Sequence, residues 1–570
     1  PALHLPDDVD GAGYGLGELA VVIEELGRVV APGPFLPTVL ASAVLARSGV
    51  AASVLRELAA GATATIALHG ALAASPAADG GVHVSGSLRP VLSGHVADLI
   101  VVSARAGDAD AEEWVVLRST DVTATVLTSV DPTRRSASLE VDALVPGDMR
   151  LPGLARDEVE QVVVALAAVE AVGVAQWCVD TAAEYAKVRE QFGRPIGQFQ
   201  GVKHRCADML SRLELARAAA WDAVRGIGDT ANGGTLAVAA AGALAFDAAF
   251  ANAKDCVQVL GGIGFTWEHD AHMYLRRALT LRQVVGGGSR WRQRCTSELR
   301  SGARRRLARG VDLPAEAEDL RLSTRAFLDS LSGLDAAAQR DRMATEGYVT
   351  PVWPRPWGRD AEALELLVIE EEFRAAKVTR PSIMVGAWAL PNLIVYGTEA
   401  QRERWILPTL RGELTWCQLF SEPGAGSDLA ALSTRAERVD GGWIVNGQKV
   451  WSSIAQMADW GILLARTAPD RPKHDGISCF MLDMKSPGVE VRPLRELTGH
   501  AMFNEVFFND VFVPDDCLVG QEHDGWRCAR TTLANERVFM GGSSTVGRGV
   551  VGLVEMLEHG GMADDTHARD

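Results

Sequence analysis

Gly441-Gly442-Trp443-Ile444-Val445-Asn446-Gly447 repeats an earlier stretch, Gly80-Gly81-Val82-His83-Val84-Ser85-Gly86, at an offset of 361 residues. At the same offset, Ala97-Asp98 before an apolar run recurs as Ala458-Asp459 before another. Val145-Pro146 corresponds to Val513-Pro514 after a few residues of drift. This period is far longer than that of a solenoid repeat, so the sequence predicts two copies of a whole set of domains.

The two copies differ in the motifs that they keep. The second carries Ser421-Glu422-Pro423-Gly424-Ala425-Gly426-Ser427-Asp428, where the first has only the small residues Gly61-Ala62-Thr63-Ala64-Thr65. The first carries Arg189-Glu190-Gln191-Phe192-Gly193-Arg194-Pro195, which the second lacks as far as residue 570. Function must therefore be interpreted across the pair.

Composition limits the class of protein. A length of 570 residues allows roughly three to five domains, and a net charge of −17 argues against a nucleic-acid partner. The eight cysteines show no metal-ligand spacing, which indicates reduced thiols, a cytoplasmic protein and no metal site. The most apolar stretch, 162–175, is too short to span a bilayer and contains Glu170, so no membrane span is expected.

Hydrophobic periodicity predicts a multidomain α+β fold made of two similar units. Each unit is expected to have a helical region, a small β domain and a helical bundle, with both ends of the chain incomplete. A charged stretch broken by Gly and Pro is typical of a linker between them. The first unit divides into helices at 1–75, a degenerate β domain at 76–152 and a bundle at 153–300; the linker is 301–316; the second unit divides into helices at 317–412, a β domain at 413–522 and the start of a bundle at 523–570.

The turn at 421–428 is rich in small residues and follows an apolar run, 416–420. Glycine lets a backbone approach an anion closely, and exposed N–H groups can bind phosphate oxygens. Downstream come Gly447-Gln448-Lys449-Val450-Trp451-Ser452-Ser453, then Asn504-Glu505-Val506-Phe507-Phe508 and Val513-Pro514. This ordered set resembles the acyl-CoA dehydrogenase family, and the resemblance covers nearly the whole chain as two units.

The resemblance implies FAD as cofactor and assigns its contacts in the second unit. Phe420, Ser421, Gly426 and Ser427 would line FAD and the phosphates of the substrate, while Trp451 and Ser453 would lie beside the isoalloxazine ring. Ser427 and Arg537 are the expected substrate-binding residues.

The helical half of the first unit supplies the complementary motifs. Arg189, Gln191 and Phe192, together with Gln258, Gly261 and Gly262, match family segments that reach the FAD of a neighbouring subunit. There an arginine pairs with the pyrophosphate. The first unit's own flavin pocket is expected to be lost, since 90–93 (Pro-Val-Leu-Ser) replaces the 451–453 segment. The resemblance therefore implies a single composite site per chain.

The catalytic base implied by the resemblance is a glutamate. The family places it either near the end of the bundle or early in the helix after the β domain. In the first unit the late segment, 282–289, has no acid, and the early position falls near Val169, with Glu170 one residue further on. Glu536 matches the early position in the second unit, and partial burial would suit it to proton abstraction. Two alternatives stay open: an ordinary helix N-terminal charge, or a competing glutamate beyond residue 570.

The implied reaction is FAD-dependent α,β-dehydrogenation of an acyl-CoA thioester to the trans-2-enoyl-CoA. Unequal paired units also resemble the heteromeric bacterial dehydrogenases of steroid-CoA thioesters, which favours a bulky acyl group such as a branched or sterol side chain. An electron-transferring flavoprotein is the implied acceptor, and a homodimer forming a pseudo-tetramer is the implied assembly. The alternatives are an acyl-CoA oxidase and a catalytically silent scaffold that binds acyl-CoA.

Overall fold

The computed structural model describes residues 2–77, 80–106, 112–305, 314–542, 548–562 and 565–569. The chain forms two compact units, Pro1–Arg309 with Arg548–Asp570, and Gly310–Gly547. These are the first and second units predicted by the repeat, each described here by itself. The assignment of 548–570 differs from expectation, because α15 (Arg548–His559) and α16 (Thr566–Arg569) group with the first unit and α15 lies against α8 (Gly288–Arg300).

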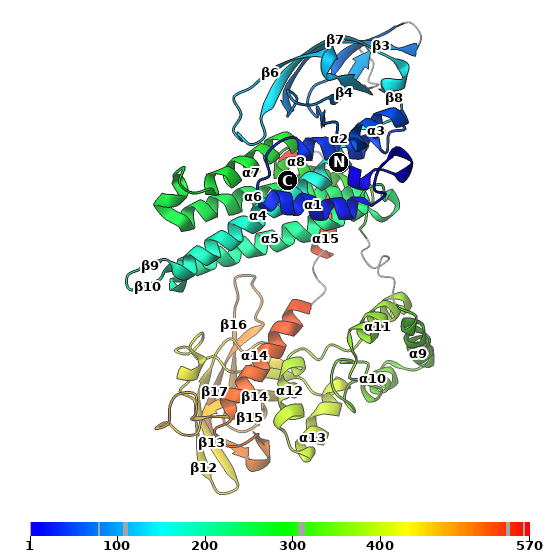
Figure 1. The fold of residues 1–570 in the computed structure, drawn as a ribbon. Coiled ribbons are helices and arrows are strands. Elements are labelled where there is room, and N and C mark those ends of the chain that lie inside the picture. The colour runs from blue at the N-terminus through cyan, green and yellow to red at the C-terminus, as the bar shows by residue number, and fades with distance from the viewer. Residues whose placement is uncertain are drawn as a thin grey trace. The chain divides into compact units, whose positions relative to one another are not determined.

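The first unit begins with three helices and continues into an eight-stranded sheet (Figure 1). The helices are α1 (Leu16–Arg28), α2 (Phe35–Leu45) and α3 (Ala52–Ala59). The strands are β1 (Ala64–Ile66), β2 (Leu72–Pro76), β3 (Val82–Leu92), β4 (Leu99–Ala106), β5 (Glu112–Arg118), β6 (Val122–Val126), β7 (Ser136–Val145) and β8 (Arg150–Leu151). Their order is β6-β7-β3-β2-β4-β5-β8, with β1 parallel to β4.

A bundle of long helices completes the first unit. It contains α4 (Arg156–Val188), α5 (Gln200–Gly226), α6 (Gly234–Leu260), α7 (Ala271–Val285) and α8, and the small hairpin β9 (Glu190–Gln191) and β10 (Arg194–Pro195) joins α4 to α5. Two glycines let α1 and α4 cross closely: a Cβ at Gly27 would lie 2.4 Å from the Glu170 carbonyl oxygen, and one at Gly173 would lie 2.0 Å from that of Glu24. Any larger residue at either position would force the helices apart.

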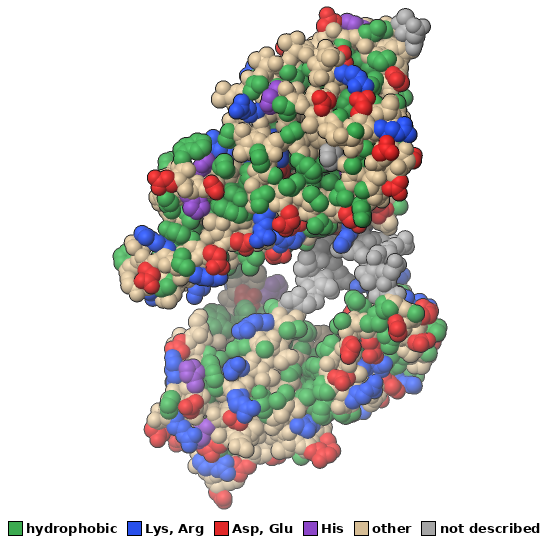
Figure 2. All heavy atoms as spheres, in the orientation of Figure 1, with side chains coloured by type: hydrophobic (Ala, Val, Ile, Leu, Met, Phe, Trp, Pro, Cys, Tyr) green, Lys and Arg blue, Asp and Glu red, His purple; other side chains and the backbone are tan. Residues whose placement is uncertain are grey.

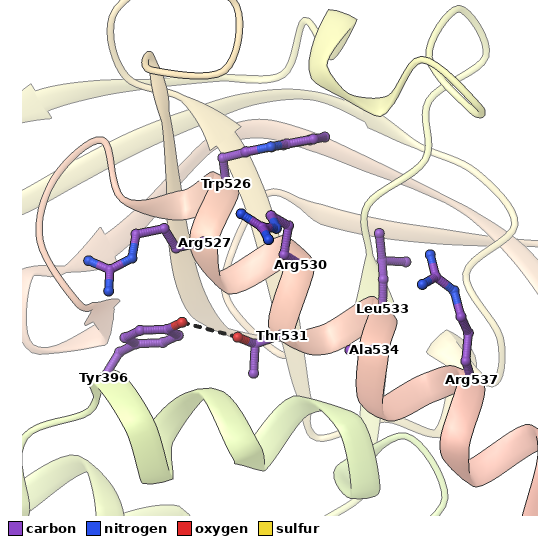
Figure 3. A pocket seen from close by; sticks show the side chains of 8 residues that line it. All are labelled: Tyr396, Trp526, Arg527, Arg530, Thr531, Leu533, Ala534 and Arg537. Atoms are coloured by element: carbon purple, nitrogen blue, oxygen red, sulfur yellow. Dashed lines mark hydrogen bonds between the residues drawn. The ribbon is translucent and has the colours of Figure 1, made fainter.

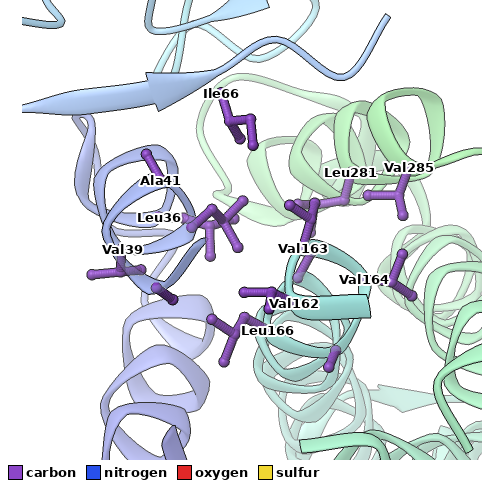
Figure 4. Close-up of a cluster of buried hydrophobic side chains, with 14 of the residues drawn as sticks. Leu36, Val39, Ala41, Ile66, Val162, Val163, Val164, Leu166, Leu281 and Val285 are labelled. Carbon is purple, nitrogen blue, oxygen red and sulfur yellow. The ribbon is translucent and has the colours of Figure 1, made fainter. Parts of the chain in front are cut away.

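Helix α4 is the centre of the first unit's core. Its side chains at Val162, Val163 and Leu166 meet residues of α2, β1 and α7 (Figure 4). By length and composition, the whole of α4 and the stretch Gly234–Phe265 could each cross a bilayer. However, 89% of the apolar window of α4 is buried inside the unit, as in the core helix of a folded domain.

The second unit repeats the same order of elements (Figure 1). Its helices are α9 (Glu316–Ser330), α10 (Ala336–Thr345), α11 (Ala363–Ala376), α12 (Gly386–Tyr396), α13 (Glu399–Leu410) and, after the sheet, α14 (Gly525–Gly542). Its strands are β11 (Trp416–Leu419), β12 (Arg435–Val439), β13 (Gly442–Lys449), β14 (Trp460–Arg466), β15 (Ile477–Asp483), β16 (Val489–Leu494), β17 (Phe503–Pro514) and β18 (Leu518–Val519). The strand order, β16-β17-β13-β12-β14-β15-β18 with β11 parallel to β14, is that of the first sheet. The predicted α+β fold of two similar units is confirmed.

The first sheet begins earlier than predicted, because β1 and β2 both begin before residue 76. The stretch Gly61–Thr65 is therefore not the counterpart of the Gly-rich turn: its last residues form β1, and Ala64 pairs with Leu99 as Trp416 pairs with Trp460. The true counterpart is the connection from β1 to β2, residues 67–71, against 420–434 in the second unit. The first unit has thus lost most of this loop.

Acidic and basic side chains are interspersed on the face drawn in Figure 2. No broad basic surface is seen among the described residues on that face. This agrees with the acidic net charge and differs from the basic face of a nucleic-acid-binding protein.

Candidate active site

A cavity of about 200 Å³ in the second unit brings together five of the residues predicted from sequence. We call it the Glu536 cavity. Its lining comes from the start of α12, the end of β11, the segment after β13, the start of β17, and α14: Val385, Trp388, Gln418, Phe420, Ser421, Val450, Trp451, Ser453, Phe503 and Glu536. Residues far apart in sequence therefore meet where the sheet adjoins two helices.

The long loop, residues 420–434, contains the Gly-rich turn. Glu422 and Ala425 exchange two backbone hydrogen bonds of 3.0 Å, which close the turn. A Cβ added at Gly424 or Gly426 would meet nothing within 4 Å, so these glycines leave open space above the backbone. Gly426 and Ser427 are exposed and do not line the Glu536 cavity. The turn is thus open on the side where a ligand would approach.

A buried ion pair fastens this loop to the sheet. Lys449, at the end of β13, donates to the Glu422 carboxylate at 2.9 Å and to the Phe420 carbonyl oxygen at 3.0 Å. Glu422 also accepts hydrogen bonds from Ser433 and from the backbone of Thr434. Burial opposes ionisation of the carboxyl, but Lys449 and these hydrogen bonds lower the pKa of Glu422 to about 2. Burial lowers the pKa of Lys449 to about 8, against the opposing effect of Glu422.

The first unit lacks both members of this pair. At the repeat offset, the position of Lys449 is held by Leu88, which is buried. The segment that would supply the carboxylate is missing from the short connection 67–71. A buried lysine without a counter-ion is costly. The absence of the carboxylate in the first unit is therefore consistent with the absence of the lysine.

The segment after β13 turns sharply and presents an indole to solvent. Trp451 has a positive φ of 61° and is 62% exposed, and its ring meets Phe503 edge-on at 6.1 Å. Val450 donates to the Ser421 carbonyl oxygen at 2.9 Å, which joins this segment to the Gly-rich turn. The Ser452 hydroxyl is buried and has no hydrogen-bond partner within the described part of the chain.

Glu536 lies half-buried on α14, at the floor of the cavity. Hydrogen bonds from α12 hold this helix, with Asn392 donating to the Thr532 hydroxyl at 2.7 Å. Gln418 Nε2 donates to Glu536 Oε2 at 3.4 Å, and Trp388 Nε1 donates to Gln418 Oε1 at 2.6 Å. Neither Trp388 nor Gln418 was predicted. A single glutamine in the apolar strand 416–420 was the available signal.

The first unit places Glu170 on the corresponding helix in a different environment. Arg134 donates to both of its carboxylate oxygens, at 2.6 and 2.7 Å, and Arg277 donates to Oε1 at 2.6 Å while also pairing with Asp131. All four side chains are buried. Burial alone would raise the pKa of Glu170, but the two arginines hold it below its ordinary value. Glu170 is thus a neutralised core residue, in agreement with the expectation that it points away from the base position.

Arg537 opens into a different cavity. This α14 pocket, of about 750 Å³, is lined by Tyr396, Trp526, Arg527, Arg530, Thr531, Leu533, Ala534 and Arg537 (Figure 3). Successive helix residues are separated by about 100°, so Arg537 and Glu536 face different sides of α14. The two predicted substrate-binding residues, Ser427 and Arg537, therefore lie outside the Glu536 cavity.

The residues predicted from the first unit lie at one end of its bundle (Figure 1). Arg189 ends α4, and Gln191 and Phe192 belong to the β9–β10 hairpin, where Phe192 is 93% exposed with a positive φ. Gln258, Gly261 and Gly262 lie where α6 ends. The Arg189 side chain makes no hydrogen bond or ion pair with the residues that the structure describes. Each unit thus holds its own group of the residues that were predicted to contact the cofactor.

Sequence profiles of one family match most of the chain. The profile for "Acyl-CoA dehydrogenase, C-terminal domain" matches residues 164–299, that for the N-terminal domain matches 315–413, and that for the middle domain matches 417–511. Acyl-CoA dehydrogenase FadE34 of Mycobacterium tuberculosis is 45% identical over 572 residues, covering 97% of this chain and 76% of the relative. Acyl-CoA dehydrogenase IpdE1 of the same organism is 40% identical over 243 residues, covering 41% of this chain and 62% of the relative.

Two solved structures give matches that cover half of the chain. A Tcur3481-Tcur3483 steroid ACAD variant aligns with a TM-score of 0.49 and 29% identity, over 53% of this chain and 85% of that one. The ChsE4-ChsE5 complex from Mycobacterium tuberculosis aligns with a TM-score of 0.49 and 27% identity, over 52% of this chain and 84% of that one.

We expect Glu422→Gln to destabilise the second unit by about 3–5 kcal/mol, because it leaves a buried ammonium without its counter-ion. Adding Lys449→Leu should recover most of this loss, since the first unit tolerates Leu88 at that position. Urea unfolding measures the stability, and hydrogen exchange of a peptide covering 420–434 measures the loop. Equal stability of the single and double variants would contradict the role given to the pair.

The same ion pair has a pH dependence of defined sign. Because the pKa of Glu422 is lowered in the folded state, its contribution is complete above the ordinary value of 4.5 and is lost as the pH falls towards about 2. The Glu422→Gln variant has no carboxyl to protonate, so exchange of its 420–434 peptide should already be faster at neutral pH and should change less on acidification than in the unsubstituted protein.

Proposed function

Because this chain belongs to the acyl-CoA dehydrogenase family, we propose that its second unit oxidises an acyl-CoA thioester to the trans-2-enoyl-CoA, with Glu536 as the base. The chain is an acyl-CoA dehydrogenase and FAD is its cofactor. The observation that supports the base is the Glu536 cavity, in which a carboxylate meets the residues assigned to the flavin.

The residues of the second unit fit FAD. The Gly-rich turn has open space above Gly424 and Gly426, so backbone N–H groups can approach phosphates. The buried Ser452 hydroxyl has no partner in the described part of the chain, and the exposed indole of Trp451 offers a flat apolar face. Phe420, Ser421, Gly426, Ser427, Trp451 and Ser453 would hold the cofactor. When bound, FAD supplies the acceptor for the hydride that leaves the β carbon.

The chain's own side chains perform the proton step. The α C–H bond of the thioester breaks, its proton goes to the Glu536 carboxylate, and the electron pair forms the new double bond as the β hydride leaves. Trp388, Phe420 and Phe503 give the cavity apolar walls that exclude water around the reacting carbons. Arg537, outside this cavity, would bind the coenzyme A part of the substrate as a cation.

We propose that one flavin is bound per chain, and that residues from both halves of the sequence hold it. Arg189, Gln191, Phe192, Gln258, Gly261 and Gly262 would complete the site, supplied by the bundle of the same chain or of a second copy. Their exposure and the unpaired state of Arg189 among the described residues support this. A homodimer would then contain four units, and an electron-transferring flavoprotein would take the electrons. Eight free thiols suit a cytoplasmic protein.

The proposed substrate carries a bulky acyl group, such as a branched or sterol side chain. The support is the position of the base on α14, the helix that follows the sheet of the second unit, and the unequal pair of units. The Glu536 cavity, at about 200 Å³, is smaller than typical pockets for drug-sized ligands, about 300–1,000 Å³. We therefore propose that the reacting side chain enters the cavity while a ring system stays outside it, near the exposed Trp451.

Replacing Glu536 with Gln should abolish turnover while the protein stays yellow, because the change keeps the shape but removes the base. Anaerobic bleaching of the flavin by an acyl-CoA measures the reaction, and peroxide formation in air identifies an oxidase. Full activity of Glu536→Gln would show that another group takes the proton.

Arg189→Ala should release FAD more readily, since the arginine is proposed to pair with the pyrophosphate. The flavin content of the purified protein, measured from its absorbance ratio, gives the result, with Arg205→Ala as a control on the same bundle. Arg205 pairs with Asp255 instead. Equal flavin content in both variants would count against a contribution from the first unit.

The acyl preference can be measured as kcat/KM over a panel of straight C8–C16 acyl-CoA esters and steroid-side-chain CoA esters. We expect the steroid esters to react at least tenfold more efficiently. A clear preference for the straight chains would reject the bulky substrate while leaving the dehydrogenase reaction intact.

A further inference from the structure

Three side chains from three separate elements form a chain of hydrogen bonds that ends on Glu536. Trp388 of α12 donates through its indole N–H to Gln418 Oε1 at 2.6 Å. Gln418 of β11 donates through Nε2 to Glu536 Oε2 at 3.4 Å. All three line the Glu536 cavity. The Glu536 carboxylate is therefore hydrogen-bonded by Gln418, and Gln418 is in turn hydrogen-bonded by Trp388.

The indole determines which way the amide of Gln418 faces. An indole N–H can only donate, so the atom that meets Trp388 must be the amide oxygen. The amide NH₂ group is then directed to Glu536, where it can only donate to the carboxylate. A reversed amide would place two donors together at Trp388 and two acceptors together at Glu536. The order of the chain is thus chemically defined as well as geometrically observed.

Gln418 is the one polar residue of β11 that faces the cavity. Its neighbours Cys417 and Leu419 are buried and apolar. In the first unit the strand register places Ile66 at this position, because Ile66 pairs with Val101 as Gln418 pairs with Ile462. Ile66 lies in the hydrophobic core with residues of α2 and α4 (Figure 4). The glutamine is present in the unit that has the glutamate and replaced in the unit that lacks it.

We propose that Gln418 is a positioning residue for the catalytic base and that Trp388 orients it. This rests on the proposed role of Glu536. Gln418 holds one carboxylate oxygen at 3.4 Å and so fixes the orientation of the group that accepts the α proton. The other described residues that line the cavity from α12, β11, the 450–453 segment and β17 are apolar or hydroxyl-bearing, so no second titratable group faces Glu536 within it. Arg537 on the same helix opens into the α14 pocket.

The test uses the FAD-loaded protein with Gln418→Met, which keeps the length of the side chain but removes both polar atoms. The acidic limb of the pH profile of kcat should move to higher pH, because the carboxylate loses a hydrogen-bond donor. KM should change less than twofold. Exchange of the substrate's α hydrogens in D₂O can be followed by mass spectrometry and does not depend on oxidation. The pH profile of this exchange rate should move in the same direction.

Trp388→Phe should move the limb in the same direction by less, because the amide then loses its orientation but keeps its donor. The double variant should match Gln418→Met alone, since Trp388 acts through Gln418. Gln448→Met is the matched control, because Gln448 makes an amide–carboxylate hydrogen bond to Glu505 at 2.9 Å elsewhere in the same sheet. It should leave the limb unchanged.

An unchanged limb in Gln418→Met, or additive effects of the two substitutions, would overturn the proposal. Flavin content of each variant reports whether it has folded, and Trp388→Phe provides a second approach if Gln418→Met is unstable. If Glu536→Gln still exchanges α hydrogens, the base assignment itself fails. If that variant is inactive while Gln418→Met behaves like the control, only the positioning role fails.

Discussion

The buried ion pair between Lys449 and Glu422 is the constraint on which the candidate site depends. Taking an ammonium out of water costs several kcal/mol, and only a well-placed carboxylate with further hydrogen bonds offsets that cost. Glu422 satisfies this condition because the long loop folds back and supplies hydrogen bonds from Ser433 and Thr434. Lys449 also holds the carbonyl oxygen of Phe420. One interaction therefore fixes the start of the Gly-rich turn, the end of β13 and one wall of the Glu536 cavity.

The two units show how the same sheet can keep its fold after losing the elements of a site. Strand order and the parallel pairing of the first strand are identical in both sheets. The differences include the connection after the first strand and two single side chains, with Leu88 in place of Lys449 and Ile66 in place of Gln418. These replacements are apolar and join the core of the first unit. The first sheet therefore keeps the same strand order without the loop-fastening ion pair and without the glutamine that contacts the base.

The sequence predicted the duplicated fold and five residues of the Glu536 cavity, because contiguous motifs carry that information. It misplaced the start of the first sheet, because β1 is a three-residue strand that is buried throughout and shows no alternation. It missed Trp388 and Gln418, which meet Glu536 only through the packing of α12 and β11 against α14. Arg537 is the next residue to Glu536 in sequence, but neighbouring helix residues face different sides, and Arg537 lines the α14 pocket instead. Local sequence patterns do not predict which distant segments come into contact.

The contrast between Glu170 and Glu536 shows what a carboxylate needs in order to act as a base. Two buried arginines stabilise the ionised Glu170 so strongly that its pKa lies below the ordinary value, and such a group has little tendency to accept a proton. A carboxylate with no neighbour at all would lack a fixed orientation and would lose the benefit of a prepared geometry. Glu536 avoids both extremes, because its neighbour is a neutral amide at 3.4 Å. A neutral donor orients the oxygen without the full charge that would suppress proton transfer. Corresponding helices can therefore carry a carboxylate that serves stability in one unit and a carboxylate that serves chemistry in the other, according to whether the partner of that carboxylate carries a charge.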